Sequence, residues 1–97
     1  MLTGKQKRYL RSLAHHLNPI FQVGKGGVNE NMVKQINDAL EARELIKVSV
    51  LQNCEMDKKT VAHELSEGAK AELVQIIGNI IVLYKESREN KQITLPH

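Results

Sequence analysis

The stretch FQVGKGGVNENMVKQI, from Phe21 to Ile36, decides the fold predicted for this chain. An apolar run ends there at the sequence GKGG, residues 24–27, which we refer to as the glycine turn. A helical pattern begins directly after it. Asn29 is a suitable N-cap for that helix, and Val28 can pack on Val33 as a hydrophobic staple. The stretch therefore predicts a strand that enters a helix through a glycine-rich connection.

A helix and a short strand are expected before the glycine turn. Leucine and alanine side chains recur at helical spacing over about residues 4–17. Thr3 and Gln6 have the spacing of a capping box, which fixes the start of this helix. Asn18-Pro19 would end it, because a proline disfavours helical backbone in the residue before it. Residues 20–23 then have the pattern of a strand that runs into the glycine turn.

A strand, a helix and a hairpin are expected in the second half of the chain. Residues 45–51 alternate between apolar and polar side chains, which is typical of a half-buried strand. Asp57 can cap a third helix. Two β-rich runs, residues 73–77 and 80–84, flank a Gly-Asn pair and predict a hairpin with a tight turn.

The resulting order, αβαβαββ, predicts an α/β fold in which helices pack on one four-stranded mixed sheet. Strands joined through helices are expected to be parallel, whereas the C-terminal hairpin is antiparallel. A chain of 97 residues has the size of a single domain, residues 1–97. Residues 88–97 have the composition of a loose polar tail.

Positive charge is concentrated in the first third of the chain. Met1 to Asn29 contains five cations and no carboxylate, whereas the remainder holds nine cations and all eleven carboxylates. Such asymmetry indicates an anionic partner, of which nucleic acid is the commonest. The alternative is a solvated basic helix without a partner. The five cations are Lys5, Lys7, Arg8, Arg11 and Lys25.

The composition also excludes several classes of protein. Hydrophobic residues make up 41% and charged residues 26% of the chain, which are ordinary values for a globular domain. No apolar run approaches the roughly 18–20 residues that cross a bilayer. Cations within residues 5–11 interrupt any signal-peptide pattern. The single cysteine, Cys54, excludes a disulfide framework and fits a reducing compartment, so a cytoplasmic protein without membrane contact is expected.

The glycine turn is a candidate phosphate site. Where a strand enters a helix, backbone N–H groups and the positive end of the helix point to one place and favour an anion. Glycines let a ligand approach the backbone closely, and Lys25 adds a positive charge. The residues that follow do not match a Walker loop, and Asn29 stands where a dinucleotide fingerprint needs glycine. Gly24 and Gly27 instead match the G-x-x-G pattern with which KH domains clamp a nucleic-acid backbone. An ordinary strand-to-helix turn is the other interpretation.

Few aromatic side chains are available to stack on bases. Aromatic residues make up 3% of the chain, and of these Tyr9 alone lies among the cations. Proteins that bind single strands by stacking carry several exposed rings. The sequence therefore favours recognition of the backbone and shape of structured RNA.

Two longer stretches, NPIFQVGKGGVNENMVKQINDALEARELIKVSV and LVQIIGNIIVLYKES, resemble the CRM domain, named for chloroplast RNA splicing and ribosome maturation. The resemblance is to the stand-alone bacterial YhbY-type members and covers about residues 3–87. It implies a fold like the C-terminal domain of translation initiation factor 3. It also implies RNA binding through the glycine turn and an adjacent basic surface, and association with precursors of the large ribosomal subunit (pre-50S).

Together these arguments predict a monomeric RNA-binding protein whose partner is ribosomal RNA. The alternative is a small adaptor that binds a protein, or a phosphorylated small ligand, through the same turn. For Lys34 and Lys47, a solvated side chain without an RNA contact is the alternative interpretation. The predicted RNA-binding residues are Gly24, Lys25, Gly26, Gly27, Asn29, Lys5, Lys7, Arg8, Arg11, Lys34 and Lys47.

Neither an enzyme nor a metal site is expected. His15 and His16 are adjacent, so on a helix they point in different directions and cannot chelate one ion. Cys54 and His63 have no further ligands nearby in the sequence and make neither a zinc site nor a convincing nucleophile–base pair. We therefore expect no catalytic residue, no cofactor and no small-molecule substrate.

Overall fold

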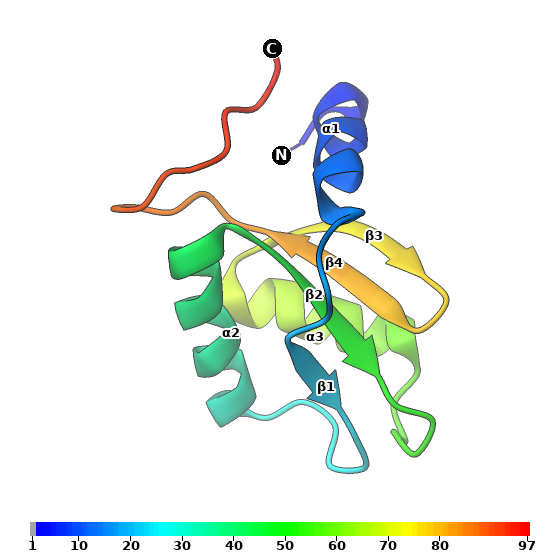
Figure 1. Ribbon diagram of the computed structural model, residues 1–97. Helices are drawn as coiled ribbons and strands as arrows, with labels where there is room; N and C mark the ends of the chain where they lie inside the picture. Colours follow the sequence, from blue (N-terminus) through cyan, green and yellow to red (C-terminus); the bar gives the residue numbers. More distant parts are fainter. Residues whose placement is uncertain (1) are drawn as a thin grey trace.

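The computed structural model describes residues 2–97 and contains three α-helices and four β-strands in the predicted order (Figure 1). Within these residues, no helix combines the length and the apolar character needed to span a bilayer. The α/β class and the order αβαβαββ are confirmed. The elements are α1 (Gly4–Ala14), β1 (Phe21–Val23), α2 (Glu30–Arg43), β2 (Leu45–Val50), α3 (Lys58–Ala69), β3 (Glu72–Ile77) and β4 (Ile80–Tyr84).

The four strands form one mixed sheet in the order β1-β2-β4-β3. β1 pairs with β2 in parallel, and Val23 lies opposite Val50. β4 runs antiparallel to both of its neighbours, β2 and β3. The hairpin between β3 and β4 turns at Gly78, which has a φ of 57°, in the left-handed region that glycine adopts most easily. The predicted mixed sheet is therefore correct.

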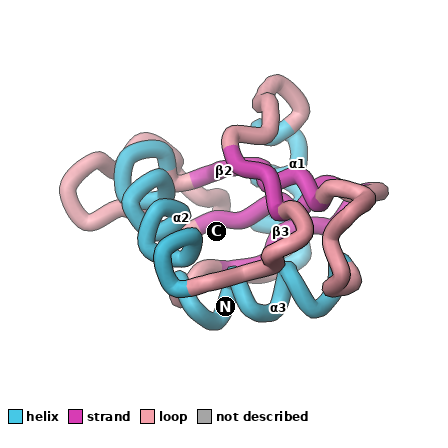
Figure 2. The backbone as a smooth tube through the Cα atoms, turned by 90° about the horizontal axis from the view of Figure 1, so that it is seen from below, coloured by secondary structure: helices cyan, strands magenta, loops and turns pink. Residues whose placement is uncertain are grey.

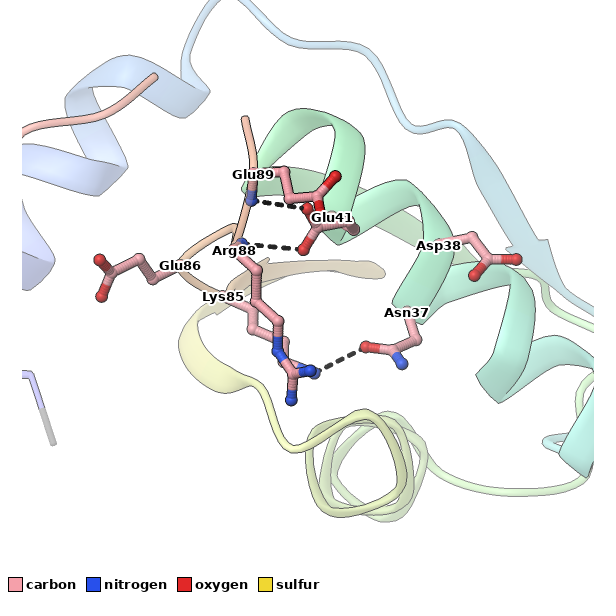
Figure 3. Close-up of a pocket in the computed structure, with 7 residues that line it drawn as sticks. All are labelled: Asn37, Asp38, Glu41, Lys85, Glu86, Arg88 and Glu89. Atoms are coloured by element: carbon pink, nitrogen blue, oxygen red, sulfur yellow. Dashed lines mark hydrogen bonds between the residues drawn. The ribbon is translucent and has the colours of Figure 1, made fainter. Parts of the chain in front are cut away.

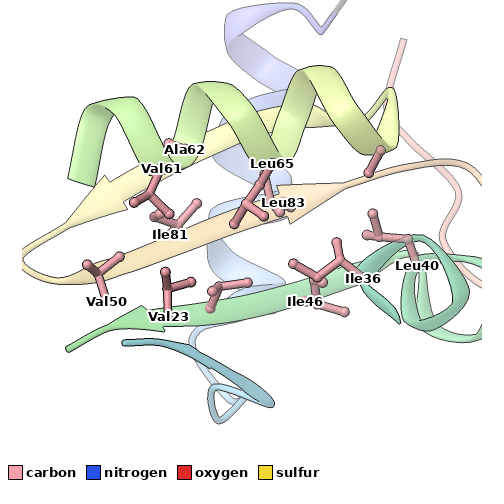
Figure 4. Packing of buried hydrophobic residues seen from close by; sticks show 12 residues of the cluster. Val23, Ile36, Leu40, Ile46, Val50, Val61, Ala62, Leu65, Ile81 and Leu83 are labelled. Atoms are coloured by element: carbon pink, nitrogen blue, oxygen red, sulfur yellow. The ribbon is translucent and has the colours of Figure 1, made fainter. Parts of the chain in front are cut away.

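Helices cover both faces of the sheet. α2 and α3 lie on one face and α1 on the other, as the view along the sheet shows (Figure 2). Between the sheet and the α2–α3 layer lies the larger hydrophobic core (Figure 4). Full burial of a Leu or Ile side chain contributes about 1.5–3 kcal/mol, so this core supplies much of the driving force for folding. Its members are Val23, Ile36, Leu40, Ile46, Val48, Val50, Val61, Ala62, Leu65, Ala69, Ile81 and Leu83.

A smaller core lies under α1 on the opposite face of the sheet. Leu10 and Ala14 of α1 pack there with residues from three strands, and half-buried Ile93 and Leu95 join them from the end of the chain. Gln6 Nε2 donates a hydrogen bond of 3.0 Å to the carbonyl oxygen of Pro96. The first helix and the last residues of the chain are thus part of one packed layer.

The predicted helix caps are all present. Thr3 and Gln6 form the capping box, with hydrogen bonds of 3.0 and 3.1 Å. Asn29 Oδ1 accepts from the backbone N–H of Met32 at 2.8 Å. Asp57 caps α3 in the same way, and the N–H of Thr60 that donates to it lowers the pKa of the Asp57 carboxyl. Short-range rules placed these helix starts correctly because a cap satisfies amides that the helix itself leaves free.

Two carboxylates at the end of α2 hold the C-terminal segment in place. Glu41 accepts hydrogen bonds from the Ser87 hydroxyl and from the N–H groups of Arg88 and Glu89, and the two backbone bonds are drawn in Figure 3. These donors lower the pKa of Glu41. Fully buried Glu44 accepts from the backbone N–H groups of three residues in the same segment. They are Ser87 at 2.8 Å, Gln92 at 2.6 Å and Ile93 at 2.8 Å.

The expectation of a loose polar tail is therefore wrong. The segment carries few apolar side chains, but its backbone amides are bonded to carboxylates and Ile93 and Leu95 are packed against α1. Composition alone predicted a loose segment because it does not reveal acceptors that lie far away in the sequence.

Candidate nucleic-acid interface

The glycine turn is a closed and exposed four-residue turn. The N–H of Gly27 donates to the carbonyl oxygen of Gly24 at 3.0 Å. Gly27 is buried and has a φ of 67°, a value that side chains other than glycine rarely adopt. Lys25 and Gly26 form the exposed outer edge of the turn. A ligand could therefore reach the turn at Lys25 and Gly26.

Unpaired amides at the turn provide donors for an anion. Within residues 2–97, the backbone N–H groups of Lys25 and Gly26 have no hydrogen-bond acceptor, and neither do those of Glu30 and Asn31 in the first turn of α2. The carboxylate of Glu30 lies in that first helical turn and opposes binding of an anion there. A phosphate is therefore more favourably bound at the outer edge of the turn, beside Lys25 and Gly26, than at the start of α2.

The loop between β2 and α3 packs against the glycine turn. A Cβ atom at Gly24 would lie 3.7 Å from side-chain atoms of both Leu51 and Asn53. The side chain of Met56 lies directly against Gly27. The N–H of Leu51 donates to the carbonyl of Val23 at 2.9 Å, which fixes this loop to the strand before the turn. The turn is consequently held in one shape without a bound ligand.

The C-terminal end of α1 brings a second group of polar side chains together on the sheet. Arg11 and His15 line a small pocket of about 40 Å³ with Lys47, Gln75 and Ile77. Lys47 and Gln75 both lie opposite Val82 in the sheet register, so they are on one row across three strands.

Sequence reasoning included Arg11 and Lys47 but missed His15 and Gln75 as members of this group. A signal was available, because Lys47 and Gln75 are polar positions flanked on both sides by apolar residues of their strands. Their pairing through Val82 depends on the strand order, which the local pattern does not reveal.

The glycine turn and α1 lie at opposite ends of the sheet (Figure 1). α1 packs over Leu45 at the start of β2, whereas the turn follows Val23, which pairs with Val50 at the end of β2. Five residue steps separate the two ends of that strand, or about 17 Å at roughly 3.3 Å per residue. The expectation that a basic helix adjoins the turn is therefore wrong in its geometry, because β1 carries the chain away from α1 before the turn.

Lys47 occupies the space between these two ends, at the middle of β2. Lys5, Lys7 and Arg8 lie farther along α1, away from Arg11 and its pocket. Lys34 lies on α2, which covers the other face of the sheet (Figure 2). The predicted cations thus form a path from the turn through Lys47 to Arg11 and then along α1, and Lys34 is separate from it.

Carboxylates are unevenly distributed between the two faces. Residues 2–27, which contain α1, β1 and the glycine turn, have none. α2 and α3 together carry five. Residues 2–27 are consequently basic, and Glu72 of β3 is the carboxylate that lies beside the start of α1, where it accepts from the N–H of Leu2. The helical layer on the other face carries five carboxylates and four cations. Those five carboxylates belong to Glu30, Asp38, Glu41, Glu64 and Glu67.

No metal site is formed by the part of the chain that the structure describes. Nowhere in residues 2–97 do three His, Cys, Asp or Glu side chains come close enough together to hold a metal ion.

Known proteins resemble this chain along nearly its whole length. A protein of Bacillus subtilis named "Probable RNA-binding protein YqeI" is 77% identical over 96 residues, which cover 99% of this chain and 100% of that protein. A Haemophilus influenzae protein named "RNA-binding protein" is 43% identical over 95 residues, 98% of this chain and 95% of its own length. The solution structure of SAV1595 from Staphylococcus aureus has a TM-score of 0.82 and 70% identity, and it covers 99% of this chain and 100% of that one.

A family model agrees with these relatives. The model of the CRS1 / YhbY (CRM) domain matches residues 2–85. The resemblance stated from the sequence is thereby confirmed, including its extent over all seven helices and strands. The chain belongs to the CRS1 / YhbY (CRM) domain family.

Proposed function

We propose that this protein binds structured RNA, without catalysing a reaction, along the path of cations from the glycine turn through Lys47 to Arg11. The exposed turn, with the unpaired amides of Lys25 and Gly26, is the observation that carries the proposal. Relatives that are named RNA-binding proteins support it. The absence of carboxylates from residues 2–27 supports it further, because no side chain of these residues repels a phosphate.

The proposed contacts divide into two groups. At the turn, a backbone phosphate accepts from the amides of Lys25 and Gly26 and pairs with the Lys25 ammonium. At the middle of the sheet, Arg11 and Lys47 bind another phosphate of the same RNA, and His15 and Gln75 offer further polar contacts. Because Lys47 lies three residue steps from Val50 beside the turn, or about 10 Å, a ligand must span more than one nucleotide to engage both groups. Contacts to phosphates position a nucleic acid without reading its sequence.

The RNA partner proposed here is ribosomal RNA within precursors of the large ribosomal subunit, bound by a cytoplasmic monomer. This finer proposal is supported by the resemblance to the bacterial YhbY-type members of the family. Cross-linking in cells, followed by sequencing of the attached RNA, tests it. We expect enrichment of large-subunit RNA over other abundant RNAs, and an even distribution would remove the ribosomal part of the proposal.

Charge reversal at the two ends of the path tests RNA binding itself. Lys25→Glu and Arg11→Glu should each weaken binding to a labelled structured RNA by about tenfold or more, because each reversal replaces an attraction with a repulsion. Arg43→Glu, on the exposed last turn of α2, is the matched control and should change the affinity by less than about twofold. If Lys25→Glu binds RNA as well as the wild type, the glycine turn is only a connection between two elements.

A phosphorylated small ligand is the second candidate, since the turn is a self-contained feature and Arg11 lies in a separate pocket with Lys47. Such a ligand needs the turn and nothing else. Arg11→Glu would then leave binding unchanged while Lys25→Glu abolished it, and this difference separates the two proposals.

A further inference from the structure

A groove of about 690 Å³ lies between α2 and α3, next to the start of α2. Its apolar lining comes from Val28, Val33 and Gly68. A Cβ atom at Gly68 would lie 3.0 Å from Cγ1 of Val33, so the two helices approach each other as closely as a glycine allows. Val28 and Val33 pack against the larger core, and part of each side chain is exposed in this groove.

Three carboxylates surround the apolar lining. Glu30 comes from α2, and Glu64 and Glu67 come from α3. All three side chains are exposed, and the remaining polar lining comes from Asn29 and His63, with no Lys or Arg. Within residues 2–97, none of these carboxylates forms an ion pair or accepts a hydrogen bond. The groove therefore combines an apolar surface with three carboxylates that are open to an incoming cation.

We propose that this groove binds a basic segment of a partner protein, in which apolar side chains are flanked by Lys or Arg. An apolar surface rimmed by polar groups is typical of a protein–protein contact. The apolar side chains of the segment would cover Val28 and Val33, while its cations pair with Glu64 and Glu67 and fix its orientation. RNA does not fit this groove, since three unpaired carboxylates repel phosphates.

The groove adjoins the glycine turn, since Val28 and Asn29 line it directly after Gly27, but it lies away from the other half of the proposed RNA path. Arg11 and Lys47 lie on the α1 face of the sheet, whereas α2 and α3 form the opposite layer (Figure 2). Proteins that associate with nucleic acid are rich in Lys and Arg, so they commonly carry segments of this chemistry. A basic segment in the groove and an RNA at Arg11 and Lys47 would then occupy opposite faces of the sheet.

A titration followed by ¹⁵N–¹H NMR tests the proposal. The probe is a short amphipathic peptide of Lys and Leu, and a peptide with Glu in place of Lys is its control. We expect the Lys peptide to shift the amide signals of Val28, Val33 and Gly68, while the Glu peptide does not. Glu64→Gln/Glu67→Gln should weaken binding by about threefold to tenfold, as expected for two partly exposed ion pairs. The double variant Asp38→Asn/Glu89→Gln has the same net charge and should bind the peptide within about twofold of the wild type.

Three results would overturn the inference. Equal weakening by both double variants would mean that the peptide follows net charge and not the groove. Binding of the Glu peptide would remove the charge complementarity. Shifts of the groove signals on concentrating the protein alone would identify a second copy of this chain as the occupant. Glu64→Gln/Glu67→Gln should leave RNA affinity within about twofold of the wild type, so failure here is distinguishable from failure of RNA binding at the turn.

Discussion

A Cβ atom at position 27 would lie 2.7 Å from the Sδ atom of Met56. Gly27 also has a φ of 67°, so its backbone conformation and its surroundings both favour glycine. Gly26, one residue earlier, has no atom within 4 Å of the position where a Cβ would stand. The neighbouring glycines therefore have different roles: Gly27 gives the turn its shape, and Gly26 leaves the outer edge open.

Alanine substitutions should separate these roles. Gly27→Ala is expected to lower the free energy of unfolding by about 1–2 kcal/mol, mainly through its left-handed backbone, since the end of the Met56 side chain can move aside. Gly26→Ala should change the free energy of unfolding by less than about 0.5 kcal/mol. Urea denaturation monitored by circular dichroism measures both. Equal losses of unfolding free energy in Gly27→Ala and Gly26→Ala would contradict the different roles given to these two glycines.

A larger side chain at position 26 tests access to the backbone of the turn. Gly26→Val should keep the stability of the wild type and lower RNA affinity by about fivefold or more, because its side chain screens the amides of Lys25 and Gly26. Fluorescence anisotropy with a labelled structured RNA gives the affinity. Wild-type affinity in the Gly26→Val protein would show that phosphates do not approach this edge.

The salt dependence of RNA binding should report how many phosphates are contacted. About four contacts predict a slope near −3 in a plot of log affinity against log salt concentration, at roughly 0.7–0.9 per phosphate. Lys25→Ala should reduce the magnitude of that slope by about 0.7–0.9, and Arg43→Ala should leave it unchanged. Anisotropy titrations over a series of KCl concentrations provide the slopes. A slope near zero for the wild type would remove the RNA proposal.

Glu44 should be the most sensitive of the carboxylates to substitution. Burial opposes ionisation of this side chain and is the largest single influence on it, but three backbone N–H donors outweigh it and lower its pKa. Glu44→Gln places an amide N–H₂ against those donors and should lower the free energy of unfolding by about 1–3 kcal/mol. Urea denaturation near neutral pH measures the loss. Gln92→Ala, which keeps the backbone N–H but removes the side-chain bond to Ala42, should cost much less.

The lowered pKa values of Glu41 and Glu44 also predict a specific dependence on pH. As the pH falls, the unfolded chain takes up these protons first, near the usual carboxyl value of 4.5. The stability that these carboxylates confer is therefore fully present above that pH and is lost as the pH falls through their lowered values. We expect the difference in unfolding free energy between the wild type and Glu44→Gln to shrink in acid. If the unfolding free energies of the two proteins fell in parallel as the pH is lowered, this prediction would be wrong.

Removal of the last residues should loosen α1. Deletion of residues 91–97 removes two of the donors to Glu44 and uncovers the packing partners of Ile93 and Leu95. The expected loss is about 2–4 kcal/mol, from two half-buried apolar side chains and one buried carboxylate that loses donors. Hydrogen exchange should accelerate in α1 more than in α3. Thr94→Ala, at an exposed position of the same segment, is the control.

Helix starts and strand alternation were predictable because their causes are local. Thr3, Asn29 and Asp57 each satisfy amides within three residues of themselves, so a short window of sequence contains the whole interaction. Helix ends were less accurate. The first helix stops at Ala14, before the expected Leu17, because the N–H of Leu17 closes a tight turn onto Ala14.

Long-range partners account for what the sequence did not reveal. The acceptors for the C-terminal amides are Glu41 and Glu44, more than 40 positions earlier in the chain. The distance between the glycine turn and α1 likewise follows from the register in which β1 pairs with β2, which no local pattern specifies. The identities of Lys25, Arg11 and Lys47 as candidate contacts were available from the sequence, whereas their arrangement required the fold.

The hydrogen bond between Gln6 and Pro96 joins positions 90 residues apart, near the two ends of the chain. During translation, α1 is made before the other six elements, and Ile93 and Leu95, which cover it, are made after all of them. The layer that contains Leu10 and Leu95 therefore cannot be completed until Leu95 has been added to the chain. The α2–α3 side of the sheet depends on no residue after Leu83 for its buried core and can form earlier.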